Sequence, residues 1–195
     1  MPGTELTRFA TYVLAGGKSR RFGSDKALAT LEGVPLIQRL VQALAPVSRA
    51  SIVVAEQAGK YASLGLTTIG DVIPDRGPLG GLLTALEHAH QRDESWCLVL
   101  TCDQVVFEPR WVDALASRLG GDDGVRAAAF RDDRWQPFPA LYHASLRGEA
   151  REAVTSGRLK MGRFLDAIAA RGVQLPADWP ELVQANTREE LERLR

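Results

Sequence analysis

A glycine loop rich in cations follows the first apolar run of this 195-residue chain. The run 9–15 leads into Gly16 and Gly17, and the polar loop that follows contains Arg21 and ends at Lys26. Glycines at the end of a strand let backbone N–H groups approach an anion, and Arg and Lys offset its charge. The loop predicts a triphosphate site. An ordinary strand-to-helix turn with solvated cations is the alternative that this spacing leaves open.

Two common glycine signatures do not fit this loop. The run 17–19 reads Gly-Lys-Ser like the end of a P-loop, but that motif needs a glycine five residues before Gly17, where Tyr12 stands. The dinucleotide fingerprint Gly-x-Gly-x-x-Gly is not supplied by glycines at 16, 17 and 23. The loop therefore belongs to another class of nucleotide site.

A second polar cluster begins at Asp71, after the strand candidate 67–69. Gly77 and Gly81 open the amphipathic stretch that follows, and their small size lets a planar ring approach the backbone where N–H groups of a first helical turn are free. This pattern fits a nucleotide base. Because Gly and Pro are frequent at helix starts, a simple turn fits the spacing equally well.

Asp103 ends a third apolar run, 98–101. A carboxylate at a strand end can hold Mg²⁺ with few protein ligands, since phosphate oxygens and water complete the octahedron. The alternative is that Asp103 only caps the turn before Pro109. Near the end of the chain, Asn186 is either a substrate contact or a helix cap.

Short apolar runs that alternate with helical patterns must position these clusters. Such runs, rich in Val, Ile, Leu and Ala, favour a mostly parallel sheet covered on both faces. Ligands bind such sheets at the carboxyl ends of the strands, where the three clusters fall. We expect strands over 9–14, 51–55, 67–69, 96–101, 125–130 and 139–142, and helices over 36–44, 79–90, 109–119, 144–156, 163–171 and from 187.

Composition bounds these expectations. With 45% hydrophobic residues the chain can bury one core, so we expect a single domain over 1–195. Because 24 Lys and Arg balance 24 Asp and Glu, we expect no nucleic-acid or anionic-lipid partner. No apolar run approaches a membrane span, and 1–8 lacks a signal-peptide core, so we expect a cytoplasmic protein whose Cys97 and Cys102 are reduced thiols.

The glycine loop resembles the pattern Leu-Ala-Gly-Gly-x-Ser-x-Arg-Met-Gly-x-Asp-Lys of the molybdenum cofactor guanylyltransferases, within the nucleotidyltransferase superfamily. Phe22 replaces the Met. The matching positions are Leu14, Ala15, Gly16, Gly17, Ser19, Arg21, Gly23, Asp25 and Lys26. The family also carries an Asp followed by Gly-Pro-Leu-x-Gly, matched here by Asp71, Gly77, Pro78, Leu79 and Gly81.

The chain departs from the family pattern at several positions. The family stretch Pro-Cys-Asp-x-Pro reads Thr-Cys-Asp-Gln-Val here, so Thr101 and Val105 replace two prolines. Near the C-terminus, Gln184 replaces the first Asn of Asn-x-Asn-Thr-Pro, and Arg188 replaces its Pro. Ala55 stands where relatives have an Asn that contacts nucleotide.

The resemblance implies a Rossmann-like three-layer α/β/α nucleotidyltransferase domain, with a nucleotide part over 9–105 and an acceptor part over 106–195. It implies transfer of GMP from GTP to molybdopterin, with Lys26 and Arg21 neutralising charge and Asp103 carrying Mg²⁺. The implied nucleotide contacts are Leu14, Ala15, Gly16, Gly17, Lys26, Asp71, Gly77, Gly81 and Asp103. Asn186 is the implied acceptor contact.

Two alternatives stay open. One is a relative that uses another base or acceptor, such as the cytidylyltransferase of the same pterin. The other is a nucleotide-binding module that regulates without catalysis. Guanine is favoured because cytosine-using relatives carry Ala-Ala-Gly and Gly-Leu-Leu-Thr-Ser where this chain has Leu-Ala-Gly-Gly and Gly-Pro-Leu-Gly-Gly. Proteins that deliver the cofactor or mature molybdoenzymes are the implied partners.

Overall fold

A seven-stranded sheet forms the centre of the protein, with strand order β5-β4-β1-β6-β8-β7-β9. The computed structural model describes residues 8–16, 25–119, 124–181, 183–185 and 187–193. β8 pairs antiparallel with both neighbours, and all other pairs in the sheet are parallel. The mostly parallel α/β sheet is thereby confirmed. Its strands are β1 (Phe9–Leu14), β4 (Ser48–Ala55), β5 (Thr68–Gly70), β6 (Trp96–Thr101), β7 (Ala127–Arg131), β8 (Trp135–His143) and β9 (Arg171–Val173).

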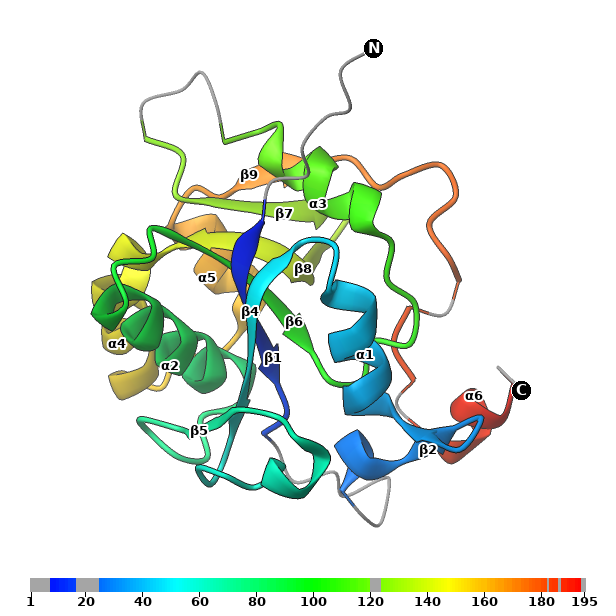
Figure 1. Ribbon diagram of the computed structural model, residues 1–195. Coiled ribbons are helices and arrows are strands. Elements are labelled where there is room, and N and C mark those ends of the chain that lie inside the picture. Colours follow the sequence, from blue (N-terminus) through cyan, green and yellow to red (C-terminus); the bar gives the residue numbers. More distant parts are fainter. Residues whose placement is uncertain (1–7, 17–24, 120–123, 182, 186, 194–195) are drawn as a thin grey trace.

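Helices cover both faces of this sheet, with α1 and α2 on opposite sides of the central strands (Figure 1). One buried cluster joins α1 (Leu36–Leu44) and α3 (Pro109–Ala116) to one face, and another joins α2 (Gly77–Gln91), α4 (Arg147–Thr155) and α5 (Met161–Ala167) to the other. Alternate β1 residues enter the two clusters, Val13 on the α1 side and Tyr12 on the α2 side. Because both faces are covered, all of β1 is buried, and Thr11 is its one polar residue apart from the hydroxyl of Tyr12.

The order of the strands creates a switch point beside β1. The chain passes from β1 to β4 and β5 on one side, then returns to β6 on the other. Loops that leave β1 and β6 therefore separate at the carboxyl edge and open a place for a ligand between them. This is the edge to which the sequence assigns its polar clusters.

The boundaries differ from the expected ones where the sequence signal is short. The expected helix 163–171 is α5, which ends at Ala167, followed by β9. The expected helix 144–156 is a 3₁₀ turn η3 (Ala144–Leu146) and then α4. β8 begins four residues before the expected strand 139–142. The antiparallel pair β2 (Thr30–Leu31) and β3 (Val34–Pro35) was not expected at all.

The C-terminal helix α6 (Arg188–Glu192) packs beside the first hairpin. Leu191 shares a small buried cluster with Leu31, Leu36 and Ala185. Thr187 is the N-cap of α6 and forms a reciprocal capping box with Glu190. The longest described helix, α2, has 15 residues, and no helix in the described ranges is long and apolar enough to cross a bilayer.

Candidate nucleotide-binding and catalytic site

Four strand ends are joined by hydrogen bonds at the carboxyl edge of the sheet. The N–H of Cys102, after β6, donates to the carbonyl of Leu14 at 2.9 Å, and the N–H of Ala15 donates to the carbonyl of Val54 at 2.8 Å. The N–H of Asp71, after β5, donates to the carbonyl of Ala55 at 2.8 Å. The loops after β1, β4, β5 and β6 therefore start from one connected framework, which brings the predicted site residues together.

Lys26 and Asp103 form an ion pair at this edge. Lys26 begins the 3₁₀ turn η1 (Lys26–Leu28), and its Nζ lies 3.0 Å from Oδ2 of Asp103. The Lys26 residue is 8% exposed, so the ammonium is held in a partly desolvated position. Oδ1 of Asp103 is buried and has no hydrogen-bond partner among the described residues. A carboxylate oxygen of this kind can accept a cation, which fits the metal-binding role predicted for Asp103.

Asp71 lies against the start of the glycine loop. A Cβ built on Gly16 would stand 3.3 Å from Oδ2 of Asp71, so the carboxylate faces the Gly16 backbone closely. Burial raises the pKa of Asp71, the nearby charges of Glu56 and Asp75 raise it further, and a hydrogen bond from Thr84 opposes them. A half-buried carboxylate at this point can accept hydrogen bonds from a ligand's hydroxyl or N–H groups.

Gly77 and Gly81, both in α2, have different roles. Gly77 has φ +61° at the first position of the helix, a left-handed conformation that favours glycine, and an added Cβ would have nothing within 4 Å. Gly81 is buried, and an added Cβ would meet both Leu14 methyl groups at 3.2 Å. Leu14 and Ala15 are also buried, so ligand contacts of these residues would involve main-chain atoms. Gly81 thus allows α2 to pack closely on β1.

Thr101 and Val105, which stand in place of two family prolines, both contact a C-terminal segment. We call residues 183–185 the C-terminal strap. The N–H of Val105 donates to the carbonyl of Val183 at 2.8 Å, a bond that a proline could not make. Nε2 of Gln184 donates to Oγ1 of Thr101 at 3.2 Å. The N–H of Ala185 donates to the carbonyl of Asp103 at 3.0 Å, so the strap also holds the metal-site candidate.

Two residues that no sequence pattern indicated contact the end of the glycine loop. Lys60 Nζ lies 2.6 Å from Oδ2 of Asp25, and the hydroxyl of Tyr61 donates to the same oxygen at 3.0 Å. Tyr61 lies between Lys60 and Ala62 in the sequence, and only the tertiary fold shows that its hydroxyl reaches Asp25.

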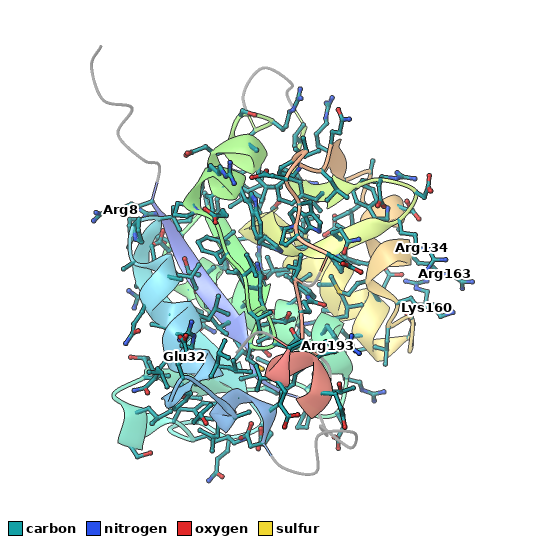
Figure 2. The ribbon with its side chains drawn as sticks, turned by 90° about the vertical axis from the view of Figure 1, so that its right-hand side faces the viewer. Arg8, Glu32, Arg134, Lys160, Arg163 and Arg193 are labelled. Atoms are coloured by element: carbon teal, nitrogen blue, oxygen red, sulfur yellow. The ribbon has the colours of Figure 1, made fainter. Side chains whose placement is uncertain are left out.

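The start of β8 lies at the same sheet edge, because β8 runs antiparallel to β6. Trp135 begins this strand. Its indole N–H donates to Asp166 at 2.7 Å, and the Arg131 guanidinium lies 4.6 Å from its ring centroid. Figure 2 shows Arg134, Lys160 and Arg163 projecting on this side of the molecule. This side of the molecule therefore presents a half-buried aromatic ring among exposed cations.

Three predicted contacts lie outside the described residues. They are Gly17, Arg21 and Asn186. The described chain contains no group of three or more His, Cys, Asp or Glu side chains arranged to hold a metal. Asp103 fits a cation that takes most of its ligands from a substrate and water.

Comparison with known proteins agrees with this arrangement. The chain is 34% identical over 181 residues to the molybdenum cofactor guanylyltransferase of Serratia proteamaculans, covering 91% of this chain and 89% of that protein. It is 30% identical to the molybdenum cofactor guanylyltransferase of Haemophilus influenzae (strain Rd), over 93% of this chain and 94% of that protein.

Solved structures show the same fold. The crystal structure of molybdopterin-guanine dinucleotide biosynthesis protein A from Archaeoglobus fulgidus superposes with a TM-score of 0.75 and 24% identity, over 95% of this chain and 96% of that one. The family described as MobA-like NTP transferase domain matches residues 11–172, which include Lys26, Asp71 and Asp103. The chain belongs to the MobA-like NTP transferase family.

Proposed function

We propose that this protein is a guanylyltransferase that transfers GMP from GTP to molybdopterin. A phosphate oxygen of the acceptor attacks the α-phosphorus of GTP, and the bond from that phosphorus to the bridging oxygen breaks, which releases pyrophosphate. The observation that carries the proposal is the Lys26–Asp103 pair at the switch point of a sheet. The choice of substrates follows the relatives at 30% and 34% identity, which are named molybdenum cofactor guanylyltransferases.

Positioning and charge neutralisation provide catalysis in this proposal. In-line transfer between phosphates needs aligned reactants and cations more than a covalent nucleophile. Gly16 offers its main-chain N–H group to the nucleotide, and Asp71 beside it accepts hydrogen bonds from hydroxyl or N–H groups of the nucleotide. Lys26 stabilises negative charge that develops on the phosphates, with Arg21 as a second cation. On the opposite side of β6, the segment around Trp135 receives the acceptor, and Asn186 is the weaker acceptor contact.

The proposed metal is Mg²⁺, bound through the buried Oδ1 of Asp103. When bound, the ion would polarise and neutralise the phosphate oxygens of the substrate. Asp103 would hold the ion, and the C-terminal strap fixes the Asp103 carbonyl. We place the reaction in the cytoplasm, alongside proteins that supply the pterin and take up the dinucleotide.

Guanine is the proposed base. Its O6 acceptor and its N1–H and N2–H₂ donors can be read by main-chain groups, and glycines leave space for a two-ring base. Ala55, which replaces a family Asn, is fully buried and uses its carbonyl to hold Asp71. Gln57 is exposed and lies two residues later, and we propose that its side chain replaces the nucleotide contact of the family Asn.

Product identification tests the proposal. The protein would be incubated with molybdopterin, Mg²⁺ and each nucleoside triphosphate, and the dinucleotide identified by mass spectrometry. We expect guanine dinucleotide, with a larger kcat/KM for GTP than for CTP. A GTP to CTP ratio at or below one would overturn the base assignment, and nucleotide binding without any product would favour the regulatory module.

A substitution of Lys26 and a control variant test the role of the Lys26 ammonium in the same assay. We expect Lys26→Ala to lower kcat by about two to three orders of magnitude, the scale of losing one preorganised charge donor. The matched control is Arg118→Ala, because Arg118 is exposed just beyond the end of α3 and has no role in the proposal. Turnover of Lys26→Ala within about threefold of the wild type, less than about 1 kcal/mol, would contradict the role.

A further inference from the structure

Tyr61 connects the sheet core to the end of the glycine loop. It precedes the 3₁₀ turn η2 (Ala62–Leu64), is 1% exposed, and shares the α1-side core cluster with Ala27. Its carbonyl accepts the N–H groups of Leu64 and Leu66 at 3.0 and 3.3 Å. Because both ring and main chain are fixed, the Tyr61 hydroxyl occupies a defined position.

Among the described residues, three donors hold the Asp25 carboxylate, and this hydroxyl is one of them. It donates to Oδ2 at 3.0 Å and approaches Oδ1 at 3.3 Å. Lys60 Nζ contacts Oδ2 at 2.6 Å and is itself held by Glu56 at 2.7 Å. The N–H of Ala27 donates to Oδ1 at 3.1 Å, which caps η1. Both oxygens of Asp25 are therefore engaged, with two donors coming from the segment after β4.

The turn that carries Lys26 depends on such an anchor. A three-residue 3₁₀ turn has too few hydrogen bonds to be stable alone, so its direction is set by what holds its ends. Asp25 is its N-cap, and Lys26 is the next residue. A shift of the Asp25 main chain would move the Lys26 ammonium away from Asp103, which it meets at 3.0 Å.

We propose that Tyr61 is a positioning residue for nucleotidyl transfer, acting through Asp25 to aim the Lys26 ammonium at the reacting phosphates. Lys60 supports the same carboxylate from the solvent side. The inference rests on the catalytic role proposed for Lys26 and adds residues that touch neither substrate nor metal. It predicts that the Tyr61 hydroxyl matters only while Lys26 is present.

A double-mutant cycle tests this dependence. We expect Tyr61→Phe to lower kcat by about tenfold, the scale of one hydrogen bond to a charged acceptor, with a smaller change in KM for GTP. In a Lys26→Ala background, we expect Tyr61→Phe to have no further effect. Additive losses in the cycle would show a general structural effect and overturn the proposal.

Tyr12→Phe is the matched control. Tyr12 is equally buried, and its hydroxyl pairs with Nδ1 of His88 at 2.9 Å on the α2 side of the sheet. We expect this variant to retain wild-type kcat. Lys60→Met removes another donor to Asp25 from a partly exposed position, and we expect a smaller loss in the same direction as Tyr61→Phe.

A labelling experiment separates this inference from the proposed function. Lys26 would be acetylated in competition at low reagent concentration and quantified by peptide mass spectrometry. We expect Tyr61→Phe to raise the labelling rate of Lys26 by about threefold or more, because one lost hydrogen bond loosens the turn, while Tyr12→Phe leaves it unchanged. Equal labelling in the wild type and Tyr61→Phe would overturn the inference. A wild type that transfers no nucleotide would overturn the function alone.

Discussion

Asp103 and Lys26 combine a stabilising contact with a proposed catalytic one. Breaking a buried pair leaves one charge without its partner, whereas removing both charges avoids that penalty. We expect Asp103→Asn and Lys26→Met each to lower the free energy of unfolding by about 1–3 kcal/mol. This is less than the loss for a fully buried pair, because Asp103 is partly exposed to solvent. The double variant should lose less than the sum. Urea unfolding measures stability, and guanylyl transfer should be lost in all three variants. Full activity in a stable double variant would exclude the pair from catalysis.

The carboxylate of Asp71 gives a pH-dependent test. Its pKa is raised in the folded state, first by burial and then by Glu56 and Asp75, so folding opposes its ionisation. Such a group favours the folded state below its unfolded pKa, and this contribution is lost as pH rises through the folded pKa. We expect Asp71→Asn to raise Tm at pH 7 and to lose this advantage below about pH 4. A Tm difference between Asp71→Asn and the wild type that stays constant from about pH 3 to 8 would contradict a raised pKa of Asp71 in the folded state. GTP binding by the variant should weaken, because a proposed acceptor is removed.

The residues proposed for the site come one by one from sequence patterns, but the contacts among them come from the structure. Lys26 and Asp103 are 77 positions apart in sequence, and only the pairing of β1 with β6 brings them together. Local patterns identified each residue because glycines and strand ends have recognisable spacing. Tyr61 carries no such pattern, since its importance comes from a hydroxyl that reaches Asp25 across the fold.

Among the elements, α2 approaches β1 through a glycine. Adding a methyl group at Gly81 brings it within 3.2 Å of two buried Leu14 methyl groups that have little room to move. We expect Gly81→Ala to lower the free energy of unfolding by about 1 kcal/mol, since the overpacking exceeds the gain in helix propensity. Gly148 in α4 is the control, because nothing lies within 4 Å of its added Cβ. Gly148→Ala should be neutral or stabilise by up to about 1 kcal/mol in thermal melts. Equal effects at the two positions would contradict the packing argument.

The C-terminal strap gives a second test at this scale. The side chains of Thr101 and Gln184, both departures from the family pattern, contact each other at 3.2 Å. We expect the variants Thr101→Val and Gln184→Met to show a coupling energy of about 0.5–1.5 kcal/mol in a double-mutant cycle of unfolding. Coupling near zero would mean that the two replacements are independent.

Which elements the sequence predicts depends on how they are buried. The spans of β1 and β6 were predicted correctly, because strands covered on both faces read as continuous apolar runs. β9 was missed because it is three residues long and gains its strand geometry by pairing with β7. The β2–β3 hairpin was missed for the same reason, with two residues in each strand.

The whole molecule shares one sheet between its two proposed halves. β6 belongs to the proposed nucleotide part, and its residues 96–99 pair with β8 from the proposed acceptor part. We therefore expect one cooperative unfolding transition, with equal calorimetric and van't Hoff enthalpies in a scanning calorimeter. GTP with Mg²⁺ should raise the midpoint, because ligands that bind only the folded state stabilise it. Two resolved transitions, one shifted by GTP, would show that the halves unfold separately.

The strap also orders events during synthesis of the chain. Residues 183–185 leave the ribosome after every strand of the sheet, yet they supply the bonds that hold Val105 and the Asp103 carbonyl. A nascent chain that has completed β9 already contains the glycine loop, Lys26 and Asp103, and it lacks the contacts that fix the metal-site loop. We expect nucleotide transfer to begin only after residues 183–185 have emerged, so that translation itself delays the onset of activity.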